Sequence, residues 1–96
     1  MSLQFSITLR NAIGDVVEST IGTAPTLEIR TGAAPANCGT ADSGTVLATM
    51  TLPSDWMAAA SGGTKALAGT WEDLTADATG TAAHFRIKQG ATCHMQ

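Results

Sequence analysis

The chain has 96 residues and a formal net charge of -3 at pH 7. This length favours a single domain over residues 1–96, and the lack of a basic cluster argues against binding to nucleic acid or to an anionic membrane surface. No apolar run is long enough for a transmembrane helix, and the first residues do not resemble a secretory signal peptide. We therefore expect synthesis in a cytoplasm, with neither a nucleic-acid nor a membrane partner.

The apolar composition predicts a weak core. Aromatic residues make up only 4% of the chain. About a third of the residues are Ala or Thr, and such small side chains bury little area at roughly 25 cal/mol per Å². We expect a marginal monomer that gains stability from oligomerisation. A large share of the hydrophobic stabilisation is expected from Phe5 and from three core residues, Trp56, Trp71 and Phe85.

The first predicted element is a helix over residues 6–21. Ser6 is a suitable N-cap, and Gly22 suits the position after the last turn. The apolar residues recur at helical spacing, so one face is apolar and we expect it to pack on a sheet. That face contains Leu9, Ile13, Val16 and Val17.

Two strands are predicted next, at 26–31 and 45–52, because apolar and polar residues alternate in both segments. The intervening residues 32–44 are rich in Gly, Pro, Asn and Asp and predict a loop. Long ordered loops are often contact elements. Candidate contact residues in this loop are Pro35, Asn37 and Asp42.

The middle of the chain is expected to form a short helical turn capped by Ser54 and then a strand at 65–74. A hairpin-like turn over residues 76–80 follows, with Gly80 at the position of positive φ.

The last predicted strands, at 81–88 and 91–96, have the clearest pattern in the chain. Ala83, Phe85 and Ile87 alternate with polar residues, so one face should be dry and the other wet. In the final strand the same rule places Cys93 beside Met95 on the dry side. The pattern reaches the last residue, which leaves a strand edge able to pair with another chain.

Taken together, these elements predict a mainly β fold with one N-terminal helix. The helix would lie against an antiparallel sheet or open sandwich of about five strands.

Two cysteines and two histidines offer the atom types of a zinc site or a thiol hydrolase. The spacing of Cys38, Cys93, His84 and His94 matches no metal motif, and neither cysteine lies in a context that lowers a thiol pKa. We therefore predict no catalytic, metal-binding or cofactor-binding residue. The cysteines are either free thiols or a disulfide.

The wet face of the strand at 81–88 carries His84, Arg86 and Lys88. These side chains form either a solvated face paired with Glu28 across the sheet or a contact for an acidic partner surface. The full set of candidate interaction residues is Pro35, Asn37, Asp42, His84, Arg86, Lys88 and His94.

Several motifs also occur in a fixed order along most of the chain. They are Arg10-Asn11 in the predicted helix, Ile29, Arg30, Gly32 and Pro35 around the first strand end, Trp71, and Gly80, Thr81, Ala82, Phe85 and Arg86. In this order they resemble a family of small bacteriophage and prophage proteins that are regarded as virion structural proteins. Members of that family continue beyond the equivalent of the last residues here into a Gly-rich hairpin and further strands.

The resemblance implies a non-enzymatic structural protein, a capsid decoration or tail component, that acts through self-assembly. Its partners would be copies of itself and a phage capsid or tail protein. It would be made in the bacterial cytoplasm and reside in a virion once assembled. The alternative is a small-ligand or peptide-binding module encoded on a mobile element, with a pocket between helix and sheet near Trp56 and Trp71.

Overall fold

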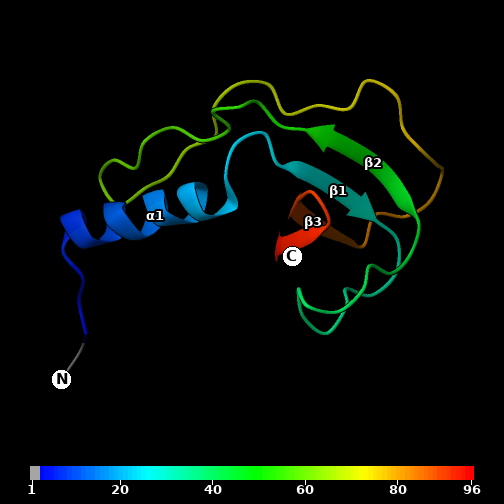
Figure 1. The fold of residues 1–96 in the computed structure, drawn as a ribbon, viewed down its shortest axis with the longest axis horizontal. Coiled ribbons are helices and arrows are strands. Elements are labelled where there is room, and N and C mark those ends of the chain that lie inside the picture. Colours follow the sequence, from blue (N-terminus) through cyan, green and yellow to red (C-terminus); the bar gives the residue numbers. More distant parts are fainter. Residues whose placement is uncertain (1–2) are drawn as a thin grey trace.

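The computed structural model describes residues 3–96, which form one helix and one four-stranded sheet (Figure 1). The sheet order is β2-β1-β3-β4, and all neighbouring strands are antiparallel. The expected mainly β fold with one N-terminal helix is confirmed, with four strands in place of about five. The elements are α1 (Ile7–Ile21), β1 (Thr26–Arg30), β2 (Val46–Thr51), β3 (His84–Gln89) and β4 (Thr92–Met95).

Both ends of α1 are capped as the sequence predicts. The Ser6 hydroxyl accepts a hydrogen bond from the backbone N–H of Leu9 at 3.1 Å. Gly22 has φ of 95° and donates its N–H to the carbonyl of Glu18. The helix does not lie against the sheet, however, but runs away from it (Figure 1). Only Ile21, at its C-terminal end, is buried, so the expected packing of the helix on the sheet is wrong.

The core lies on one face of the sheet and contains Ile21, Leu52, Trp56 and Ile87. Trp56 is 1% exposed, and its Nε1 donates to the carbonyl of Gly22 at 2.9 Å. The Trp71 ring packs against Trp56 with centroids 5.9 Å apart. The core assignment of the two tryptophans holds, whereas Phe5 is 47% and Phe85 38% exposed.

Residues 53–83 cross this core as an irregular segment that contains neither a helix nor a strand of the sheet. The helical turn after Ser54 and the strand at 65–74 are therefore wrong predictions. The segment folds back on itself, because Trp71 Nε1 donates to the carbonyls of Trp56 and Ala68. Gly69, with φ of 69°, supports this reversal by packing directly on Pro53.

The turn glycines are also placed differently from the prediction. One tight turn lies between β3 and β4, where Gly90 has φ of 61°. Gly80 is not among the glycines of positive φ. It is needed for space, since a Cβ there would lie 3.0 Å from side-chain carbons of Leu47 and Thr31.

A bulge in β4 breaks the alternation of the last strand. Ile87 pairs with Met95, but Lys88 pairs with Cys93, which leaves His94 as the extra residue. Cross-strand partners share a face of the sheet, so Cys93 and Met95 lie on opposite faces. The prediction that both point to the dry side is therefore wrong. Met95 joins the apolar face, and Cys93 lies on the charged face.

Among residues 3–96, no helix is both long and apolar enough to cross a membrane.

Candidate functional site

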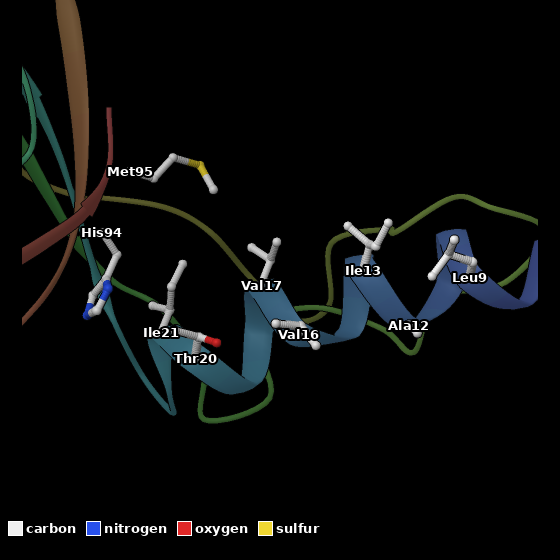
Figure 2. Close-up of a pocket in the computed structure, with 9 residues that line it drawn as sticks. All are labelled: Leu9, Ala12, Ile13, Val16, Val17, Thr20, Ile21, His94 and Met95. Carbon is white, nitrogen blue, oxygen red and sulfur yellow. The ribbon is translucent and has the colours of Figure 1, made fainter. Parts of the chain in front are cut away.

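The apolar face of α1 is uncovered. We use the name apolar helix face for Leu9, Ala12, Ile13, Val16, Val17 and Thr20. Val16 is 58% exposed and Ile13 is 49% exposed. These residues line a hollow of about 580 Å³ that ends at His94 and Met95 of β4. In Figure 2, Leu9, Ile13 and Val17 point to the same side of the helix, and Met95 closes the far end.

The opposite, polar face of α1 is turned toward the rest of the chain. Asp15 Oδ1 accepts hydrogen bonds from Lys65 Nζ at 2.8 Å and from the N–H of Ala60 at 2.9 Å. The N–H of Gly63 donates to Asn11 Oδ1 at 2.8 Å. Lys65 also forms an ion pair with Glu18. The irregular segment thus fixes the helix by its polar side.

Two local features support this inverted orientation. Gly14 faces the same irregular segment, since a Cβ there would lie in van der Waals contact with the Ala60 Cβ, at 3.4 Å. The hydrogen bond from Lys65 lowers the pKa of Asp15, and the same bond raises the pKa of Lys65. Both shifts favour the charged pair that holds the helix in place.

The charged face of the sheet is covered by the loop between β1 and β2. Arg86 is the centre of this contact, with a side chain that is only 2% exposed. Its guanidinium forms an ion pair with Asp42 and donates to the carbonyls of Asn37 and Thr40, both at 3.0 Å. Its Nε donates to Gln96 Oε1. A buried guanidinium with this many acceptors anchors the loop.

Asp42 is the acidic hub of the same contact. Lys88 Nζ lies 2.6 Å and Arg30 3.3 Å from its carboxylate, beside the Arg86 pair. Hydrogen bonds from Lys88 and then Arg86 lower the pKa of Asp42 to about 2. Glu28 adds a second acid, 3.1 Å from Arg30 and 3.6 Å from Lys88. We call these five residues the Asp42 cluster.

The structure thus brings together three of the seven candidate interaction residues, Asp42, Arg86 and Lys88. Asn37 and Pro35 contribute through their carbonyls, the latter accepting from Gln96 Nε2 at 2.7 Å. The cross-sheet pair with Glu28 is present, but a solvated face is wrong for Arg86 because the loop buries it. While the loop is in place, Arg86 is not presented to a partner.

The two histidines lie at different places in the sheet, since His84 is the cross-strand partner of Arg30 and His94 lies in the bulge of β4. His84 Nδ1 donates to the carbonyl of Gly32 at 2.8 Å. His94 is exposed on the bulge and borders the apolar hollow beside α1. In residues 3–96, no three His, Cys, Asp or Glu side chains gather as a metal site.

The cysteines are brought together across the loop contact. Cys38 Sγ and Cys93 Sγ lie 2.6 Å apart. Burial and the contact with Cys38 raise the pKa of the Cys93 thiol. Such a thiol is a poor nucleophile at neutral pH.

A second apolar hollow, of about 410 Å³, lies over the core face of the sheet. Its walls include Trp56, Trp71, Leu67, Phe85 and Met95. The binding-module alternative predicts a pocket near Trp56 and Trp71, but between the helix and the sheet. No residue of α1 lines this hollow, so the predicted position between helix and sheet is wrong.

The apolar helix face is the feature that sequence reasoning missed. The pattern identifies the helix and its apolar residues but assumes that this face meets the sheet. The available signal was on the other face, where Asn11, Asp15 and Glu18 could meet a donor such as Lys65.

No family model, curated protein or solved structure matches the chain.

Proposed function

We propose that the protein is a non-enzymatic structural protein of a phage or prophage particle, a capsid decoration or tail component, that acts through self-assembly. The observation that carries self-assembly is the orientation of α1, with its polar face inward and its apolar face exposed. The phage context rests on the sequence motifs around Arg30, Pro35, Trp71 and Arg86.

Exposure of this face has a free-energy cost that a partner removes. Burying a Leu, Ile or Val side chain completely contributes about 1.5–3 kcal/mol. Leu9, Ile13, Val16 and Val17 are 36–58% exposed, so covering each would contribute on the order of 1 kcal/mol. Two copies in contact would each gain the sum of these four contributions. This free energy supports a reversible complex after the entropy cost of association is subtracted.

A second copy of the chain is the occupant that fits this face. The lining residues of the hollow include no Asp, Glu, Lys or Arg, so a two-fold contact brings no like charges together. The acidic residues Asp15 and Glu18 are already paired with Lys65 on the other side. The hollow continues to β4, an edge strand of the sheet. Helix face and strand edge can therefore form one continuous contact.

Light scattering of Val16→Asp tests the assembly surface. We expect the wild type to exceed the monomer mass at micromolar concentration or above, and Val16→Asp to remain monomeric. Leu74→Asp is the matched control, because Leu74 is 87% exposed and lies outside α1. It should assemble like the wild type. A wild type that stays monomeric throughout this range would contradict the proposal.

Detection of the chain by mass spectrometry in purified phage particles tests the phage context separately. Its absence from particles, together with normal self-assembly, would retain the assembly surface and reject the virion role.

The second candidate function, a small-ligand or peptide-binding module, is favoured by the hollow beside Trp56 and Trp71. Titration with an apolar peptide, followed by tryptophan fluorescence, tests it. A saturable change in a monomeric protein would favour the binding module, whereas an unchanged spectrum favours the structural role.

A further inference from the structure

The two cysteines approach each other from segments that are far apart in the sequence. Cys38 lies in the loop between β1 and β2, and Cys93 lies in β4. Their sulfurs are 2.6 Å apart, close to the S–S bond length of about 2.05 Å and closer than unbonded sulfurs normally approach. The bulge at His94 produces this meeting, because it turns Cys93 toward the loop.

The loop is held in this position by contacts on both sides of Cys38. Arg86 binds the carbonyls of Asn37 and Thr40, which flank the cysteine. Thr40 closes a turn over the same stretch, since its N–H donates to the Asn37 carbonyl at 3.1 Å. Farther along, Gln96 binds the Pro35 carbonyl. The approach of the two thiols is therefore built into the fold and does not depend on the cysteines themselves.

A small reagent can reach this pair. Both cysteines are only half-buried, and they border a hollow of about 320 Å³ that also touches Arg86 and Lys88.

We propose that Cys38 and Cys93 form an intramolecular disulfide that locks the loop onto β4 when the protein meets an oxidising low-molecular-weight disulfide. The Cys38 thiolate attacks a sulfur of the small disulfide and releases one small thiol. The second cysteine then attacks the mixed disulfide, forms the Cys38–Cys93 bond and releases the other small thiol. Both cysteines are oxidised, the small disulfide is reduced to two thiols, and the two cysteine protons balance them.

The cross-link would stabilise the fold. It closes a long loop of the chain, because the two cysteines are 55 positions apart. Closing such a loop lowers the entropy of the unfolded state, and for a domain of this size the melting temperature should rise by about 10 °C or more.

Equilibration of the full chain with oxidised or reduced glutathione tests this proposal. Oxidised protein should lose both titratable thiols and about 2 Da of mass, and should yield a proteolytic fragment joining Cys38 to Cys93. The molar mass by light scattering should not change on oxidation. Reduction should reverse the thiol loss and lower the melting temperature.

The matched controls are Cys93→Ser, which leaves Cys38 alone, and the double variant Cys38→Ser/Cys93→Ser. The single variant should stop at a mixed disulfide with glutathione, and the double variant should melt at the same temperature in both buffers. Two persistent thiols in the wild type, or a cross-link that joins two copies, would overturn the proposal.

Discussion

The Asp42 cluster and the apolar helix face are treated in opposite ways by the fold. The cluster collects five ionised groups on one face of the sheet, and the loop between β1 and β2 covers them. The helix face collects Leu, Ile and Val side chains, and nothing in residues 3–96 covers them. A monomer usually buries apolar groups and exposes charges. The charged contact is complete within one chain, whereas the proposed function requires a second copy to cover the apolar surface.

Hydrogen bonds and ion pairs within each region explain how it is held in place. In the charged region, Arg86 satisfies two loop carbonyls as well as Asp42, so each buried donor has an acceptor. At the helix, Lys65 and the backbone of Ala60 hold Asp15 and thereby turn the apolar side outward. The predictions below test these regions from the largest expected effect to the smallest.

Arg86→Met should have the largest effect, because it leaves Asp42 and two loop carbonyls without their buried donor. We expect the melting temperature to fall by about 10 °C or more, measured by circular dichroism. Arg10→Met is the control, since Arg10 is exposed on α1, and its melting temperature should remain close to the wild type. Equal losses in the two variants would contradict the anchoring role of Arg86.

Ile21→Ala and Ile13→Ala make the same change at a buried and at an exposed position of α1. Ile21 is 5% exposed, so its truncation should cost about 2–5 kcal/mol of the free energy of unfolding. Ile13 is half-exposed, and Ile13→Ala in a dilute monomer should cost less than about 0.5 kcal/mol. Urea denaturation measures both values. A cost at Ile13 as large as that at Ile21 would show that the helix face is already buried in one chain.

Acid should weaken the Asp42 cluster. The pKa of Asp42 is about 2 in the folded chain, below the ordinary value of 3.8. Its ionised form therefore stabilises the fold above pH 3.8, and this contribution disappears as the pH falls from 3.8 to 2. Melting temperatures from pH 5 to pH 2 should decrease more steeply for the wild type than for Asp42→Asn. Parallel curves would be inconsistent with a stabilising Asp42 carboxylate.

Among the substitutions of charged residues, Lys65→Met should have the smallest effect on global stability, because the Lys65 pairs lie near the surface and surface pairs contribute little. We expect a fall of about 5 °C or less in the melting temperature, with faster hydrogen exchange in α1. Lys65→Arg keeps the charge, so hydrogen exchange in α1 should be slower in this variant than in Lys65→Met. Unchanged exchange in both variants would show that the lysine does not hold the helix.

Local sequence signals predict the local structure well. The Ser6 and Gly22 caps, the helix and the two strands around the long loop follow from capping preferences and alternation. The strand at 65–74 fails because Trp71 binds the carbonyls of Trp56 and Ala68, a tertiary contact that no periodicity encodes. The Cys93 position fails for a related reason, since the extra residue at His94 places Cys93 and Met95 on opposite faces of the sheet, where strict alternation would place them on the same face.

The candidate site was harder to predict because it depends on how elements meet. Alternation identifies Arg86 and Lys88 as one polar row, but the loop that covers them is fixed by Asp42, which is more than 40 positions away in the sequence. Helical periodicity identifies Ile13 and Val16 as one apolar face but gives no direction for that face. The direction is set by Lys65, Ala60 and Gly63, which lie in an irregular segment.

A dilution series of methyl NMR spectra tests the central claim most directly, because it locates the contact between copies. Methyl resonances of Leu9, Ile13, Val16 and Val17 should shift with protein concentration. Those of Leu52, in the core, and of Leu74, at an exposed position outside α1, should stay constant. Spectra in which the α1 methyl resonances do not change, or in which only Leu74 shifts, would contradict assembly through the apolar helix face.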